Sequence, residues 1–217
     1  MSLKSSIRSI MTMGKGLAQG LPEAAADRDP IDLFSEWFEA ARESGILLPE
    51  AVTLATATAE GAPSARMVLL KDFSDRGFEF YTNFGSRKAK ELDENPQAAL
   101  LAYWPILERQ VRIEGTVERV SLEKSNAYFL TRSRGSRLGA WASKQSENLD
   151  TVAHLRARFE RYDEQFRGSE VPLPPFWGGY RVKPERIEFW QGRLNRLHDR
   201  LLFCRTESGW EPTRLYP

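Results

Sequence analysis

The sequence predicts a mainly β protein with several helices, an α+β fold whose antiparallel strands close into one barrel. Five short segments between residues 51 and 120 are β-branched, aromatic or alternating in pattern, and turn signals separate most of them. The chain has 217 residues, of which 41% are hydrophobic and 11% aromatic, enough for one substantial core. Short strands that follow one another along the chain favour antiparallel pairing and closure into a barrel.

We expect residues 1–26 to be a flexible arm and residues 27–217 to be a single domain. The arm holds Ser, Gly, Ala and basic residues but no acid before Glu23. The ordered part opens with a helix from Asp29, a good N-cap followed by proline, to a stop at Gly45. One face of this helix is aromatic at helical spacing, which is typical of core packing, and it consists of Phe34, Trp37, Phe38 and Ala41.

After this helix the hydrophobic period changes from helical to extended. A short helix over residues 86–95 interrupts the predicted strands, which cover residues 51–59, 64–73, 77–83, 97–105 and 109–120. Helical spacing returns between residues 121 and 166. A loop then leads to two final strands, over residues 180–192 and 200–217.

The overall charge and the cysteine count exclude several classes of partner. Lys and Arg number 31 and Asp and Glu 30, so the net charge of +1 favours neither nucleic acid nor an acidic membrane. Cys204, the single cysteine, cannot form an intrachain disulfide, and one Cys with two His cannot assemble a zinc site. The chain has no apolar run long enough for a membrane span and no secretory signal. We therefore expect a cytoplasmic protein in which positive charge matters locally.

One of the two histidines, His198, lies among three arginines in the segment EFWQGRLNRLHDR, which contains Arg193, Arg196 and Arg200. A positively charged imidazole is disfavoured among three guanidinium groups. The cluster is best explained by an anion that binds there, in the turn between the two final strands.

Two cations, Arg87 and Lys88, occupy the first turn of the predicted short helix, directly after its N-cap Ser86. The helix dipole favours acids at this position, but a bound phosphate would reverse the effect, since backbone N–H groups and both side chains could converge on it. The alternative is two solvated surface residues. In the preceding strand segment RMVLLK, Arg66 and Lys71 have opposite parity, so one of them can face inward, although strand ends often carry such charges.

A second basic cluster, TRSRGSR, follows the predicted helix that carries Tyr128. Gly135 permits close backbone approach, Ser136 can donate a hydrogen bond, and Arg132 can bind a phosphate through two hydrogen bonds. Tyr128 and Arg132 are four residues apart and would share a helix face. This segment is either an anion pocket or a solvated basic turn that pairs with glutamates. Two phosphate-sized sites and the His198 group would imply two anionic small molecules rather than one polyanion.

Amide groups, one hydroxyl group and one aromatic ring flank these clusters, in the side chains of Gln110, Gln145, Ser146, Trp190 and Gln191. Such groups can read the edge of a planar heterocycle while an aromatic ring covers it, although Trp in a strand is more often part of the core. The residues alone support a barrel that binds phosphorylated ligands.

Six segments resemble, in the same order, the pyridoxamine 5′-phosphate oxidase family over most of residues 30–217: RMVLLK, FYTNFGSRKAKEL, RQVRIEG, SNAYFLTRSRGSRLGAWASKQS, PPFWGGYRV and EFWQGRLNRLHDR. The resemblance implies an FMN-binding split β-barrel of Greek-key-like topology, in a homodimer with two active sites at the subunit interface. It implies that residues 173–217 serve dimerisation and the active site. The implied reaction oxidises pyridoxamine 5′-phosphate or pyridoxine 5′-phosphate to pyridoxal 5′-phosphate and reduces O2 to H2O2.

The resemblance also assigns residues. It implies FMN contacts at Arg66, Met67, Val68, Leu69, Leu70, Lys71, Tyr81, Thr82, Arg87, Lys88, Gln110, Gln145, Ser146, Trp190 and Arg200. It implies substrate contacts at Lys71, Tyr128, Arg132, Ser136, Arg196, Leu197 and His198, with Arg196 and His198 as the catalytic pair beside the pyridine ring. The implied chemistry is hydride transfer from the substrate to the flavin, with no metal.

Two departures from the family pattern leave substrate closure and preference open. No Arg-x-x-Tyr segment occurs in residues 1–26, so the substrate lid is unassigned, and Leu194 stands where a smaller or polar residue is expected. Three alternatives are kept: a related flavin oxidase with another substrate, such as a phenazine-pathway enzyme; a non-catalytic flavin-binding or haem-handling split barrel; and a structural domain with solvated basic clusters.

Overall fold

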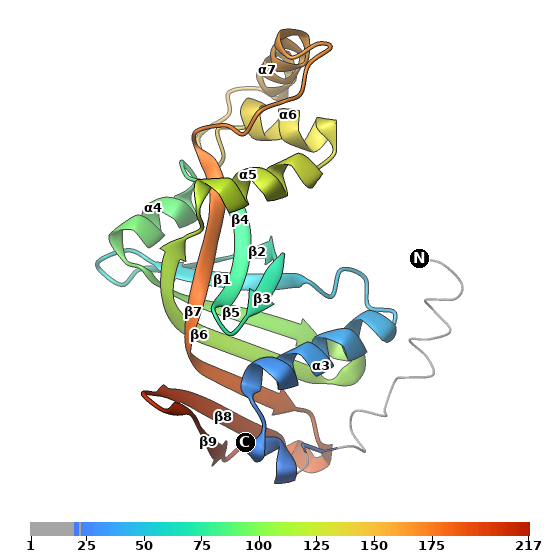
Figure 1. Ribbon diagram of the computed structural model, residues 1–217, viewed down its shortest axis with the longest axis vertical. Coiled ribbons are helices and arrows are strands. Elements are labelled where there is room, and N and C mark those ends of the chain that lie inside the picture. The colour runs from blue at the N-terminus through green and yellow to red at the C-terminus, as the bar shows by residue number, and fades with distance from the viewer. Residues whose placement is uncertain (1–19, 22) are drawn as a thin grey trace.

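The computed structural model describes residues 20, 21 and 23–217, and nine strands of this part form one curled antiparallel sheet (Figure 1). The strand order is β2-β1-β5-β6-β7-β4-β3, with β8 paired to β7 and β9 paired to β8. The predicted mainly β, α+β barrel fold is confirmed. The strands are Ala51–Ala57 (β1), Pro63–Leu69 (β2), Asp72–Ser74 (β3), Gly77–Asn83 (β4), Gln97–Trp104 (β5), Arg109–Arg119 (β6), Trp177–Gln191 (β7), Asp199–Thr206 (β8) and Gly209–Leu215 (β9).

The long strand β7 organises the sheet because it pairs with three other strands. Along one edge it pairs with β6 over most of its length. Along the other edge, its first half pairs with β4 and its second half with β8. A glycine is needed where β6 shifts register against β7: a Cβ at Gly115 would lie 1.9 Å from the carbonyl oxygen of Lys183.

Helix α3, Pro30–Glu43, closes the hydrophobic core, as its aromatic face predicts. The Asp29 side chain caps the helix by accepting a hydrogen bond from the Ile31 N–H at 2.7 Å. Phe34 is fully buried and packs edge-on against Phe78, with ring centroids 5.0 Å apart. Trp37 packs in the same way on Phe189 of β7 at 5.2 Å. Each buried aromatic side chain stabilises the fold by about 1.5–3 kcal/mol.

Two strand predictions are wrong in their boundaries. Residues 64–73, predicted as one strand, form β2 and β3, and the chain changes partner between them: the Leu70 N–H donates to Glu50, before β1, while the Lys71 N–H donates to Glu79 of β4. Residues 200–217, also predicted as one strand, belong to the β8–β9 hairpin, which turns at Glu207 and Ser208 just before Gly209, whose φ is +141°.

The remaining helices lie mainly beyond one end of the sheet (Figure 1). They are α4 (Arg87–Glu94), α5 (Leu122–Thr131), α6 (Arg134–Ala142) and α7 (Val152–Gln165), as the helical spacing predicts. Three short 3₁₀ helices complete the described part: η1 (Glu23–Asp27), η2 (Pro105–Leu107) and η3 (Leu194–Arg196).

The described part of the predicted arm contacts the domain. Leu21 and Ala25 are buried, with 7% and 3% of their surface exposed, and the Leu21 N–H donates to the Asp199 carboxylate at 3.1 Å. The ordered chain therefore starts before the expected boundary at residue 26. The rest of the arm lies outside the described residues. Within the described ranges, no helix is long and apolar enough to cross a bilayer, and no group of three or more His, Cys, Asp or Glu side chains could hold a metal ion.

Candidate active site

A cavity of about 610 Å³ opens between the β4–β7 region of the sheet and helices α5 and α6, and we call it the α5–α6 pocket. Sequence reasoning predicted eight of its lining residues: Leu69, Lys71, Tyr81, Thr82, Tyr128, Arg132, Ser136 and Gln145. It missed Trp177, which lies within the quoted motif PPFWGGYRV at the start of β7. The pocket thus brings together five of the fifteen residues of the FMN set with four of the seven residues of the substrate set.

Arg132 gives the α5–α6 pocket its positive charge. Its guanidinium lies over the Trp177 ring, 4.8 Å from the centroid, and has no ion pair among the described residues. Its Nη1 is buried without a hydrogen-bond partner. Burial lowers the pKa of Arg132, and the nearby Tyr128 opposes this shift. Because a buried charge without a partner is costly, the pocket favours an anionic ligand.

Three stacked aromatic rings form one wall of this pocket. The centroids of Tyr81 and Tyr128 are 4.1 Å apart, and Trp177 stacks with them at 5.6 and 6.2 Å. Burial, together with the charge of Glu79, raises the pKa of Tyr81 to about 12, so its hydroxyl stays protonated. A flat wall with hydroxyl groups at its edge suits a planar heterocycle.

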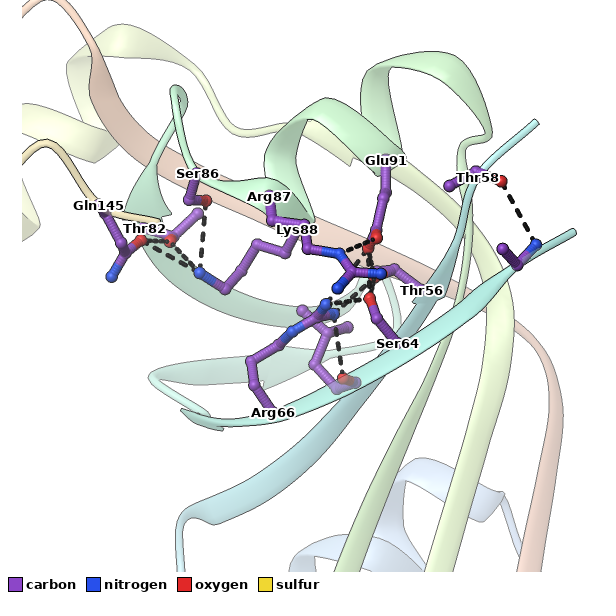
Figure 2. A network of polar contacts seen from close by, with 12 residues as sticks. Thr56, Thr58, Ser64, Arg66, Thr82, Ser86, Arg87, Lys88, Glu91 and Gln145 are labelled. Carbon is purple, nitrogen blue, oxygen red and sulfur yellow. Dashed lines mark hydrogen bonds and ion pairs between the residues drawn. The ribbon is translucent and has the colours of Figure 1, made fainter. Parts of the chain in front are cut away.

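The second cationic site lies at the start of α4 and consists of Thr82, Ser86, Arg87, Lys88 and Gln145; we call it the α4 cluster. Buried Lys88 donates to the side-chain oxygens of Thr82 at 3.2 Å, Ser86 at 3.3 Å and Gln145 at 3.1 Å (Figure 2). These acceptors are neutral, and no carboxylate of the described chain lies within ion-pair distance of Lys88. Burial, together with the charge of Arg66, lowers the pKa of Lys88 to about 8, and the charge of Glu91 opposes this shift.

The backbone of the α4 cluster also offers hydrogen-bond donors. Ser86 is the N-cap but does not cap the helix with its side chain. Within the described residues, the N–H groups of Arg87 and Lys88 make no hydrogen bond, as expected for the first turn of a helix. Two free N–H groups, a buried lysine and an arginine in one place fit a phosphate group.

The residues of β2 differ in which way they face. Met67 and Leu69 are exposed on the outer face of the sheet, with 60% and 39% of their surface accessible. Val68 packs against the core and Leu70, just beyond the strand, is buried in it. Only the backbone of these two residues can therefore reach a ligand. Arg66 faces the buried carboxylate of Glu91.

The other predicted residues lie around the far end of β7. Gln110, Trp190 and Arg200 pair directly across β6, β7 and β8. His198 packs on Trp190, with ring centroids 4.6 Å apart. Its Nδ1 accepts a hydrogen bond from the Arg193 N–H at 3.2 Å, so in the neutral ring the proton is on Nε2.

The anion predicted for the His198 group is only partly required, because carboxylates already neutralise two of the three arginines. Arg200 donates to Glu188 at 2.7 Å, and Arg193 pairs with Asp199 at 3.5 Å. The exposed side chain of Arg196, in contrast, has no ion pair or hydrogen bond within the described chain. Its φ of +60° is unfavourable for a residue other than glycine, and such strain is common at functional sites.

Within one protomer, the residues of the α5–α6 pocket and the residues around the far end of β7 lie too far apart to form one site. Trp177 begins β7 and Trp190 lies near its end, which places them roughly 40 Å apart along the strand. Ser146 is also outside the α5–α6 pocket, in an adjacent cavity of about 350 Å³ that Gln145 lines as well. A complete site that contains Arg132 and His198 therefore needs a second copy of the chain.

Comparison with known proteins identifies the family. The family model described as pyridoxamine 5′-phosphate oxidase matches residues 38–166, and the model described as the pyridoxine 5′-phosphate oxidase C-terminal dimerisation region matches residues 177–217. The chain belongs to the pyridoxamine 5′-phosphate oxidase family. The predicted family is thus confirmed, and with it the class of FMN-dependent oxidoreductases.

Similar proteins of the pyridoxamine 5′-phosphate oxidase family cover almost the whole chain. The pyridoxine/pyridoxamine 5′-phosphate oxidase of Rubrobacter xylanophilus is 60% identical over 91% of both chains, and that of Psychromonas ingrahamii is 52% identical over 100% of both. The crystal structure of PhzG from Burkholderia lata, in complex with tetrahydrophenazine-1-carboxylic acid, superimposes with a TM-score of 0.87 at 32% identity, covering 93% of this chain and 100% of that one. An FMN-binding protein from Nostoc punctiforme shares the fold, with a TM-score of 0.70 at 17% identity over 86% of this chain and 96% of that one.

Proposed function

We propose that the protein oxidises pyridoxamine 5′-phosphate and pyridoxine 5′-phosphate to pyridoxal 5′-phosphate, with O2 as the final electron acceptor and H2O2 as its product. The observation that carries this proposal is the half-buried guanidinium of Arg132, whose buried Nη1 has no hydrogen-bond partner, in a pocket with an aromatic wall. It supplies a second anion site in addition to the α4 cluster. A cofactor and a substrate that each carry a phosphate group would use both.

FMN would be held through its phosphate by the α4 cluster. The free N–H groups of Arg87 and Lys88 and the Lys88 ammonium would bind the phosphate, and Arg66 would add a further cation. When bound, FMN supplies the acceptor for the two electrons removed from the substrate. Thr82 and Gln145, which already bind Lys88, are placed to contact the cofactor beside its phosphate.

The substrate phosphate would lie against Arg132, Lys71, Tyr128 and Ser136, which line the α5–α6 pocket. Arg196 and His198 of a second protomer would contact the pyridine ring. Because Nδ1 of His198 accepts the Arg193 N–H, its Nε2 would donate a hydrogen bond to the substrate. The charged Arg196 would orient the substrate and stabilise charge that develops on it.

A homodimer is proposed from the outer face of the sheet. Met67, Leu69 and Tyr103 are exposed there, although large apolar groups on one face are usually covered. Gln110, Trp190 and Arg200 pair across adjacent strands, and residues 177–217 match a dimerisation region. A twofold pair formed through this region would complete each site with residues of both copies. The cytoplasmic location stays a prediction from Cys204, which is a free thiol.

A second candidate function is the oxidation of an aromatic carboxylate, because the structurally similar PhzG was solved with such a ligand. Arg132 could bind a carboxylate as well as a phosphate. The 60% identity to a pyridoxine/pyridoxamine 5′-phosphate oxidase favours the phosphate ester.

An aerobic assay of the FMN-loaded protein tests the proposal. With either phosphorylated vitamer we expect pyridoxal 5′-phosphate and H2O2 to form in equal amounts, because each substrate oxidation returns two electrons to one O2. The same assay with tetrahydrophenazine-1-carboxylic acid as substrate tests the second candidate. If this acid is oxidised and neither vitamer is, the proposed substrates are wrong, although the protein is still a flavin oxidase.

The pH dependence of FMN binding should report on Lys88. In the free protein the Lys88 ammonium has a pKa of about 8, so it loses its proton above that pH. A bound phosphate dianion, which forms above pH ~6, would keep Lys88 protonated. FMN binding then takes up a proton, so we expect its Kd to be constant between pH ~6 and pH ~8 and to rise up to about tenfold per unit above pH ~8. Riboflavin, which lacks the phosphate, serves as the control in fluorescence titrations. A Kd of FMN that stays constant up to pH ~9.5 would contradict this placement of the phosphate.

A further inference from the structure

A buried carboxylate, Glu91, lies between two arginines of the proposed FMN site (Figure 2). Only 4% of its surface is exposed. Its Oε1 accepts from Arg87 Nε at 2.8 Å, one turn earlier on α4, and its Oε2 accepts from Arg66 Nη2 of β2 at 3.2 Å. A single side chain thus fixes one cation from the helix and one from the sheet.

Two hydroxyl groups hold this carboxylate in place. Thr56 and Ser64, directly opposite each other in the β1–β2 register, donate to Oε2 at 2.5 and 2.6 Å. Both hydroxyl oxygens in turn accept from the Arg66 guanidinium. Burial alone would raise the pKa of Glu91, but the hydrogen bonds from Ser64, Thr56, Arg87 and Arg66 outweigh it and hold the pKa at about 2. Glu91 is therefore a fixed anion at physiological pH.

We infer that Glu91 is a positioning residue for FMN: it holds Arg66 and Arg87 beside the start of α4, where the phosphate is proposed to bind. This inference rests on the proposed placement of FMN. Sequence reasoning included both arginines but not Glu91, although its i,i+4 spacing from Arg87 was a signal.

The charges of the site fit this role. Arg66, Arg87 and Lys88 carry three positive charges, and Glu91 removes one of them. The remaining two match the charge of a phosphate monoester, which is close to a dianion at neutral pH.

Without Glu91, the two arginines would have no shared anchor in the free protein. The Arg87 side chain is 62% exposed, and the half-buried Arg66 would lose its only carboxylate among the described residues. Each would then have to be ordered when the phosphate binds, which costs roughly two- to tenfold in affinity for each side chain. Simple charge attraction predicts the opposite, because removal of an anion would tighten FMN binding. The sign of the change therefore tests the positioning role.

The test compares Glu91→Gln with a matched control, Glu94→Gln. Glu94 is exposed on the same helix and has no ion pair within the described chain, so this control removes the same charge without removing a contact. We expect Glu91→Gln to raise the Kd of FMN about tenfold and to leave the Kd of riboflavin within about twofold, while Glu94→Gln changes neither. An unchanged or lower Kd of FMN in Glu91→Gln would overturn the inference, and so would an equal loss of FMN and riboflavin.

Two further variants keep the outcome interpretable. Ser64→Ala retains the Glu91 charge but removes one of its donors, so we expect a smaller rise in the Kd of FMN in the same direction; no rise would count against positioning. Lys88→Met tests the site itself. If Lys88→Met weakens the binding of FMN relative to that of riboflavin and Glu91→Gln does not, only the positioning role of Glu91 is refuted. If neither does, the proposed phosphate placement is wrong and the inference falls with it.

Discussion

Replacement of Arg132 with methionine should raise the KM for pyridoxamine 5′-phosphate by about a hundredfold and leave FMN binding unchanged. A phosphate that binds a half-buried guanidinium through two charge-assisted hydrogen bonds gains about 3 kcal/mol from them, and methionine makes neither. The α4 cluster does not involve Arg132, so the cofactor should be retained. Steady-state kinetics and the flavin absorbance after dialysis measure the two effects.

The same substitution should not destabilise the substrate-free protein. Arg132 Nη1 is buried without a partner, and methionine can pack on Trp177 without the cost of a buried charge. We therefore expect an equal or higher Tm. The exposed Arg156→Met on α7 is the charge-matched control and should leave KM unchanged. An unchanged KM in Arg132→Met, or loss of substrate and flavin together, would contradict the assignment of Arg132 to the substrate phosphate.

Replacement of Arg196 with alanine should lower kcat/KM by about a hundredfold or more, with FMN content unaffected. In the described chain the Arg196 side chain has no partner of its own, so the substitution breaks no ion pair of the fold. An arginine that stabilises charge developing in the transition state typically contributes about 3–4 kcal/mol to catalysis. Turnover in a peroxide assay, with flavin content determined on the same sample, measures this effect.

Two control variants separate charge from loop shape. Leu194→Ala alters an exposed neighbour in η3 and should keep near-normal turnover. Arg196→Lys retains the charge but not the planar fork and should recover part of the activity. Normal turnover in Arg196→Ala would refute the catalytic role of this residue.

The strands and helices were largely predictable because their signals are local. Asp29 and Gly45 mark the ends of α3, and the alternating segments became strands with boundaries close to those expected. The errors lie where tertiary contacts determine the end of a strand. The break between Leu70 and Lys71 arises because the chain changes its pairing partner, which no local pattern encodes. The missed β8–β9 turn did have a local signal in Gly209.

The cationic residues of the site could be predicted from the sequence, but the side chains that pair with them and pack around them could not. Lys88 stands out in sequence because it occupies the first turn of a predicted helix, and Arg132 because it lies in a basic cluster; the structure leaves both without a carboxylate partner among the described residues. Arg200, in contrast, meets Glu188 across two strands, and this pair follows only from the strand register. For the same reason Trp177 was missed, since its role depends on packing between β7 and α5.

In the proposed dimer, each active site joins the α5–α6 pocket of one protomer to the His198 loop of another. The most direct test mixes two variants, Arg132→Met and Arg196→Ala, that are each nearly inactive. Random pairing makes about half of the dimers mixed, and each mixed dimer holds one site in which both halves are native. We therefore predict recovery of about a quarter of the wild-type activity after subunit exchange. If the exchanged mixture is no more active than the two variants measured separately, although mixed dimers are present, the site is not shared between protomers.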